Sequence, residues 1–146
     1  MITIFDNPLM IPKLIKLAEE VPNTPLDKLK KFMFATLNKP NTKAYIDIHD
    51  GVIRGFMYAS IEEWDGDKCV FIQFCVLKPC EEDKYICFEM LTKMKLWAKQ
   101  NDITQIYFAT QRNPEAFCRK YKFEFHSTIL KLDISEKKEL AHVQNV

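Results

Sequence analysis

The spacing of hydrophobic residues changes along the chain, and each change marks a different kind of predicted element. After a short apolar run at 2–6, apolar residues recur every three or four positions in two segments. The first segment ends near Asn23 and the second before Pro40, so the pattern predicts a short strand and then two helices. Thr24, followed by Pro25 and Asp27, is a start signal for the second helix, with the Thr24 hydroxyl as the expected cap. From Lys43 the period becomes two, which is typical of strands. Helical spacing returns after Pro79.

Three strands are predicted in the middle of the chain, at 43–50, 51–64 and 68–78. They are joined by two Asp-Gly dipeptides, which favour tight hairpin turns, so we expect an antiparallel meander. The third strand is almost continuously apolar, which predicts a central place in the sheet. Cys69 and Cys75 have the same strand parity, so both side chains are expected on one face as small hydrophobic groups.

The last third of the chain begins with a long helix that carries apolar residues on one face, namely Ile86, Met90, Met94 and Trp97. Four further segments follow it: a strand at 104–110, a short helix from Pro114 to about Lys122, a strand at 123–134 and a polar tail at 135–146. Together the elements predict an α/β (α+β) fold. We expect a mixed sheet of about six strands, together with four helices. The order of elements is β-α-α-β-β-β-α-β-α-β, and they form a single domain at 1–134.

This order of elements resembles the fold of the GNAT N-acetyltransferases, in which three antiparallel strands precede a strand–loop–helix unit that grips coenzyme A. The resemblance covers nearly the whole chain, from Ile2 to Ile134. Three segments carry it locally. They are Val76-Leu77-Lys78-Pro79, similar to the family's V-x-P exit from the fourth strand, the apolar pair Met90-Leu91 in the next helix, and the fourth-helix ending FCRKYKFE at 117–124.

The resemblance implies a coenzyme A site between the fourth strand and the third helix. In the family, backbone N–H groups of a Q/R-x-x-G-x-G/A loop hold the diphosphate, and the corresponding stretch here is 82–87. Both glycine positions carry larger side chains, and Glu82 stands at the Arg/Gln position. The implied coenzyme-binding residues are Cys75, Val76 and Leu77 for the pantetheine arm, and Lys84, Tyr85, Ile86 and Cys87 at the helix.

Glycine is scarce: average usage gives about 10 in a chain of this length, whereas this one has three and none after Gly66. In addition, Glu81, Glu82 and Asp83 stand where the diphosphate would bind, and like charges repel. An alternative interpretation is that these acids cap the helix themselves, since carboxylates favour the positive end of the helix dipole. The stretch therefore favours a self-capped helix over a phosphate site.

The same resemblance places Cys118 where many family members have a tyrosine that protonates the leaving thiolate, with Tyr121 nearby and Lys122 at a family glycine. Cys118 and Tyr121 are thus catalytic candidates if the chain is active, and packing residues otherwise. Glu62 and Glu63 are candidates for a general base, although a solvated hairpin tip would also explain them.

Composition and charge exclude several other classes. The formal net charge is +1, so the chain has no strong overall positive potential that would attract a polyanion. We therefore expect no nucleic acid as primary ligand. We find no apolar run long enough for a membrane span and no signal-peptide pattern, so a location in the cytoplasm or in a particle assembled there is expected. Five cysteines without a CxxC pair, and scattered histidines, predict free thiols and no metal site.

Phe32 and Phe34 are separated by about 200° around a helix, so one of the two rings should be partly exposed. A partner surface or a substrate pocket would each use such a ring.

Two hypotheses follow for the function. In the first, the GNAT fold has lost catalysis, needs no cofactor and serves a structural or binding role with a protein partner or a larger assembly. Under this hypothesis the chain resembles GNAT-like modules that have lost catalysis and occur in bacteriophage particles, so its location would be a virion. In the second, the chain is a divergent N-acetyltransferase that uses acetyl-CoA, with Cys118 or Tyr121 as the acid.

Overall fold

The computed structural model describes residues 1–64, 66–109, 114–124, 126 and 132–135. It divides into two compact units, Met1–Thr110 and Gln111–Val146, which are described separately. The first unit contains the sheet and three of the helices. In the described part of the second unit, Pro114–Tyr121 form the helix α4. The expectation of one domain at 1–134 stays a prediction.

The first unit is built on a five-stranded mixed sheet. The predicted meander is confirmed, because neighbouring strands from β1 to β4 pair in antiparallel fashion, while β4 and β5 run parallel. The spatial order is the order in sequence: β1 (Ile2–Ile4), β2 (Thr42–His49), β3 (Val52–Trp64), β4 (Asp67–Leu77) and β5 (Ile106–Phe108).

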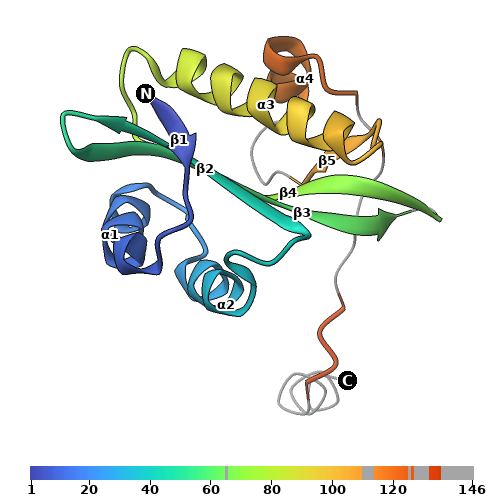
Figure 1. Cartoon of the computed structure of the whole chain (residues 1–146), viewed down its shortest axis with the longest axis horizontal. Coiled ribbons are helices and arrows are strands. Elements are labelled where there is room, and N and C mark those ends of the chain that lie inside the picture. The colour runs from blue at the N-terminus through green and yellow to red at the C-terminus, as the bar shows by residue number, and fades with distance from the viewer. Residues whose placement is uncertain (65, 110–113, 125, 127–131, 136–146) are drawn as a thin grey trace, which may run out of the picture. The chain divides into compact units, whose positions relative to one another are not determined.

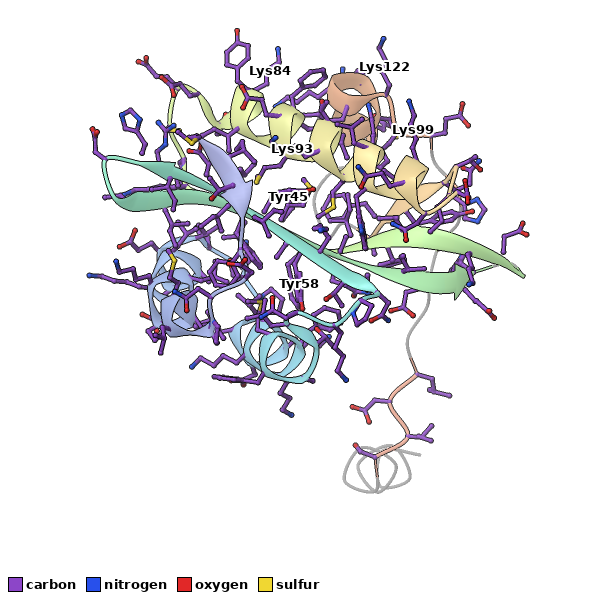
Figure 2. All side chains as sticks on the ribbon, viewed as in Figure 1. Tyr45, Tyr58, Lys84, Lys93, Lys99 and Lys122 are labelled. Atoms are coloured by element: carbon purple, nitrogen blue, oxygen red, sulfur yellow. The ribbon has the colours of Figure 1, made fainter. Side chains whose placement is uncertain are left out.

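Helices lie on both faces of this sheet (Figure 1). One face carries α1 (Ile11–Glu20), which follows the short 3-10 helix η1 (Pro8–Met10), and α2 (Leu26–Thr36); the other face carries α3 (Asp83–Gln100). Figure 2 shows Tyr58 on the side of α2 and Tyr45 on the side of α3. Each inner helix face is apolar and buried, and the four residues predicted for the long helix are all among them: Ile86, Met90, Met94 and Trp97.

Left-handed backbone positions occur mostly at residues other than glycine. Asp50 and Gly51 have φ values of 50° and 75°, as the predicted hairpin turn requires. Asn23 and Lys122 also have positive φ, and Lys122 directly follows α4, where a glycine is the usual residue. The resemblance implied a glycine at this position, and the positive φ of Lys122 is a conformation that glycine adopts readily.

Several local predictions were wrong or fall outside the described residues. Thr24 does not cap α2; its Oγ1 donates instead to the carbonyl oxygen of Val21 at 2.9 Å, and Pro25 occupies the cap position. The strand expected at 104–110 is shorter, since β5 covers Ile106–Phe108. Most of the strand expected at 123–134 lies outside the described residues, and the described ones in it are not in a strand.

Two β-bulges interrupt the meander, and the sequence pattern did not indicate either. In β3, Arg54 is extra, because Asp47 pairs with Gly55 and Ile48 with Ile53. In β4, Gln73 is extra, because Tyr58 pairs with Phe74 and Ala59 with Ile72.

The bulge at Gln73 overturns the prediction that Cys69 and Cys75 share a face. An extra residue shifts the alternation of side chains by one position. Cys69 pairs with Glu62, whereas Cys75 lies against α3, with its Sγ atom 4.0 Å from that of Cys87. Counting parity fails here because the count assumes an unbroken strand.

Among the residues that the structure describes, no helix combines the length and apolar character that a membrane span needs.

Candidate functional site

Within the part of the chain that the structure describes, the ladder between β4 and β5 is short. It joins Val70–Ile72 to Ile106–Phe108, and no further rung is found among the described residues. On its other side, β4 continues to pair with β3 as far as Leu77. The segment Phe74–Leu77 thus lies beyond the last rung shared with β5 and begins at the bulge. This segment includes the three residues that the resemblance assigned to the pantetheine arm.

A cluster of charged groups joins the N-terminus, β2 and β3 to the start of α3. Asp47 is 3% exposed, and its carboxylate accepts hydrogen bonds from Arg54 Nε at 2.8 Å and from the ammonium group of Met1 at 3.0 Å. Arg54 also donates from Nη1 to Glu82 Oε2 at 3.1 Å. The hydrogen bond to Asp47 raises the pKa of Arg54 above its already high usual value. The guanidinium therefore stays positively charged beside Glu82.

The prediction that α3 caps itself was wrong. Glu82 holds the cap position, but its side chain makes no cap hydrogen bond and turns toward Arg54 instead. The Glu82 carboxylate instead accepts a hydrogen bond from a charged guanidinium, and a hydrogen bond between two charged groups is stronger than one between neutral groups. The first turn of α3 therefore has no side-chain cap from Glu82.

The two side chains at the family's glycine positions lie in different environments. Tyr85 is 66% exposed and so does not fill the space beside β4, whereas Cys87 is buried against the sheet. Lys84, between Asp83 and Tyr85, is exposed near the start of α3, and Figure 2 shows it at that end of the helix. Ile86 packs over Gly55 of β3.

On the face that carries α2, three polar side chains form a chain of hydrogen bonds starting at the bulge. Gln73 Nε2 donates to Ser60 Oγ at 3.0 Å, and Ser60 Oγ donates to Glu62 Oε1 at 2.8 Å. Ser60 is buried and Glu62 is exposed. Of the two sequence-predicted base candidates, Glu62 is therefore held in position by neighbours. Sequence reasoning missed Ser60 and Gln73, because a bulge brings them together.

Aromatic side chains lie on the same part of the sheet. The Trp64 ring centroid is 6.1 Å from that of Phe71 and 6.3 Å from that of Tyr107. Phe71 pairs with Ser60 across the strands, so the rings share a face with the polar chain. The exposed carboxylate of Glu62 thus has an aromatic surface beside it.

The remaining candidates lie elsewhere. Cys118 and Tyr121 are both in α4, three residues apart and partly buried; α4 belongs to the second unit, so their catalytic role stays a prediction. Phe32 packs against Tyr58 and Phe74, with ring centroids at 5.0 and 5.7 Å, while Phe34 is 74% exposed. The expectation that one ring is exposed is confirmed, and the interaction role stays a prediction.

Within the described part of the chain, no group of three or more histidine, cysteine, aspartate or glutamate side chains could hold a metal ion.

Solved structures with this architecture are acetyltransferases. The aminoglycoside 6'-N-acetyltransferase AAC(6')-IG of Acinetobacter haemolyticus matches with a TM-score of 0.76 and 14% identity, over 92% of this chain and 98% of that one. A predicted acetyltransferase of Clostridium acetobutylicum, solved with acetyl-CoA, matches with a TM-score of 0.72 and 17% identity, over 92% and 97%. An acetyltransferase of Trypanosoma brucei matches with a TM-score of 0.69 and 12% identity, over 92% and 99%.

At these identities the likeness shows the fold alone: the chain has the GNAT acetyltransferase fold, as the sequence resemblance predicted. No protein-family model matches the chain, and no curated protein matches it in sequence.

Proposed function

We propose that this protein binds an acyl-coenzyme A, with acetyl-CoA as the reference ligand, and transfers the acyl group to an amine. The observation that carries the proposal is the early end of the β4–β5 ladder: pairing stops at Ile72 while β4 continues to Leu77. A strand edge of this kind can receive an extended, amide-containing chain such as pantetheine. Neighbours of the same fold were solved with acetyl-CoA or CoA.

The residues present fit the pantetheine end of such a ligand. Backbone groups of Val76 and Leu77 would hold the arm, and the bound thioester would supply an activated acyl group. Glu62 would accept the proton that the amine loses, since its carboxylate is exposed and held by Ser60. Gln73 would orient Ser60, because it donates a hydrogen bond to the Ser60 hydroxyl.

The residues that would lie beside the coenzyme diphosphate differ from the family pattern. We therefore expect the coenzyme to bind more weakly than it would to the family's glycine loop. Glu81 and Glu82 are exposed acids beside the start of α3 and would repel a diphosphate. Arg54 partly offsets this repulsion through its ion pair with Glu82, and Lys84 adds a positive charge. Arg54 thus brings positive charge to a place where the family relies on glycine backbone.

A second candidate function is a non-enzymatic role in binding or assembly, including that of a particle component. Two observations favour it: the acids at the start of α3, and the exposed ring of Phe34 on α2. In this case acetyl-CoA would not bind, and Phe34 would lie in a contact with a protein partner.

Calorimetric titration of the full chain with acetyl-CoA tests the proposal. We expect a dissociation constant in the micromolar range. Glu82→Gln should tighten binding by about fivefold to tenfold, because the amide keeps a hydrogen bond to Arg54 but removes a negative charge from the diphosphate end.

Glu89→Gln is the matched control, since it removes the same charge from an exposed position two turns further along α3. It should leave the affinity unchanged. Absence of binding at about 1 mM acetyl-CoA in both the unmodified chain and Glu82→Gln would refute the proposal and leave the second candidate.

A further inference from the structure

Two cysteine thiols meet between the sheet and α3. The Sγ atoms of Cys75, on β4, and Cys87, in α3, are 4.0 Å apart. Two structural features bring them together. The bulge at Gln73 turns Cys75 toward α3, and Gly55 on the neighbouring strand lets α3 approach the sheet closely, since a Cβ atom there would lie 2.9 Å from Ile86 Cγ2.

The two thiols differ in exposure in a way that suits a stepwise reaction. Cys75 is partly exposed, whereas Cys87 is only 3% exposed. A reagent from solution would therefore reach Cys75 first, and Cys87 would react with it inside the protein. Cys69, on the same strand, is buried and pairs with Glu62, whose side chain lies on the opposite face.

We propose that Cys75 and Cys87 form a reversible intramolecular disulfide, with a low-molecular-weight disulfide as the oxidant. The Cys75 thiolate attacks one sulfur of the oxidant, which forms a mixed disulfide and releases one thiolate. The Cys87 thiolate then attacks the Cys75 sulfur and releases the second thiolate. The protein loses two electrons and two protons, and these convert the oxidant into two thiols.

The cross-link would tie the start of α3 to the segment Phe74–Leu77. Closing the bond requires the two sulfurs to approach from 4.0 Å to about 2 Å, which side-chain rotation and a small helix shift can supply. The bond would close a short loop and so restrict the unfolded chain, which raises stability. The inference does not depend on the proposed acyl transfer, because its evidence is a covalent bond and not ligand binding.

The test uses the full chain carrying Cys80→Ser and Cys118→Ser, which removes the exposed thiol of the first unit and the thiol of the second. After incubation with oxidised glutathione at neutral pH and quenching in acid, we expect a mass loss of two hydrogen atoms with no retained glutathione. Dithiothreitol should reverse this loss. The oxidised protein should melt about 5 °C or more above the reduced one.

Peptide mapping identifies the bond. Trypsin isolates Cys87 in the peptide 85–93, and chymotryptic cleavage after Phe71 and Phe74 separates Cys69 from Cys75. Adding Cys75→Ser or Cys87→Ser to this background should abolish the link. Mapping the unmodified chain gives the same answer if a variant fails to fold. A glutathione adduct that never resolves, or a link that persists in Cys75→Ser, would overturn the proposal.

Discussion

Gln73 shows how much of this molecule depends on one residue. As the extra residue in β4 it marks the end of the β5 ladder, and its side chain donates to Ser60, which in turn donates to Glu62. Glu62 is exposed, so its carboxylate is still accessible from solution while Ser60 holds it.

At this scale we predict that Glu62→Gln lowers the rate of acetyl transfer by about 10²-fold or more, because the amide cannot accept the amine proton. Binding of acetyl-CoA should not change, since the substitution keeps shape and a hydrogen-bond acceptor for Ser60. The measurement is release of free coenzyme thiol with a panel of primary amines. Glu63→Gln is the control, because Glu63 is equally exposed on the alternate side of the strand. Equal losses in both variants would count against Glu62 as the base.

Two short motifs show how well the sequence predicts the backbone at single positions. Asp50-Gly51 was predicted as a turn and is one, since Asp-Gly tolerates positive φ at both positions. Thr24 was predicted as a cap and is not one, because its hydroxyl reaches back to Val21 instead. A local motif predicts the backbone well only when no nearby carbonyl competes for the same side chain.

The contact between β3 and α3 depends on the one glycine that lies inside a strand. A Cβ atom at position 55 would lie 2.9 Å from Ile86 Cγ2 and 3.1 Å from Leu77 Cδ2. The Cγ2 methyl of Ile86 moves aside only if χ1 leaves the rotamer that a β-branched residue strongly prefers in a helix, or if the helix shifts. This contact determines how near α3 lies to the sheet.

We predict that Gly55→Ala destabilises the fold by about 1–3 kcal/mol, because the added methyl overpacks the interface. Urea unfolding followed by circular dichroism measures the change. Ile86→Ala alone should also destabilise, by about 2–5 kcal/mol, through the cavity that it leaves. In the double variant the methyl added by Gly55→Ala would occupy part of the cavity left by Ile86→Ala. The double variant should therefore lose less free energy of unfolding than the two single variants lose in sum. A strictly additive loss would contradict the proposed overlap.

Whole elements were easier to predict from the sequence than their exact pairing. The apolar spacing in the long helix is regular, so it was sufficient for Met90 and Met94 to be placed correctly in the core. The bulges at Arg54 and Gln73 carry no composition signal and follow from contacts across strands. The ion pair of Arg54 with Glu82 and the meeting of two cysteines at α3 are both consequences of those bulges, so the sequence could not predict them.

Considered as a whole, the first unit is unevenly held together. β3 pairs with strands on both sides over Gly55–Ser60, whereas β1 contributes three residues at one end of the described sheet order. Local opening costs least where few hydrogen bonds and buried contacts must break. The terminal strand β1 is therefore expected to open more readily than the centre of β3.

We predict that backbone amides of Ile2–Ile4, in the short terminal strand β1, exchange with deuterium at least about tenfold faster than those of Phe56–Ala59. Hydrogen exchange read by NMR or by mass spectrometry of peptides measures the difference. If acetyl-CoA binds as proposed, saturation with it should slow exchange of Val76 and Leu77 and leave Phe56–Ala59 unaffected. Uniform exchange across the sheet would contradict this prediction.

The consecutive order of the strands has a consequence for how the protein folds. From β1 to β4 every strand pairs with its neighbour in sequence, with the two helices α1 and α2 inserted after β1, so most of the sheet forms through contacts of low contact order. β5 follows α3 in the chain, so it can pair with β4 only after the whole of α3 has been synthesised. Among the described strands β5 is synthesised last, so the meander can assemble during synthesis before the strand that pairs with β4 has emerged from the ribosome.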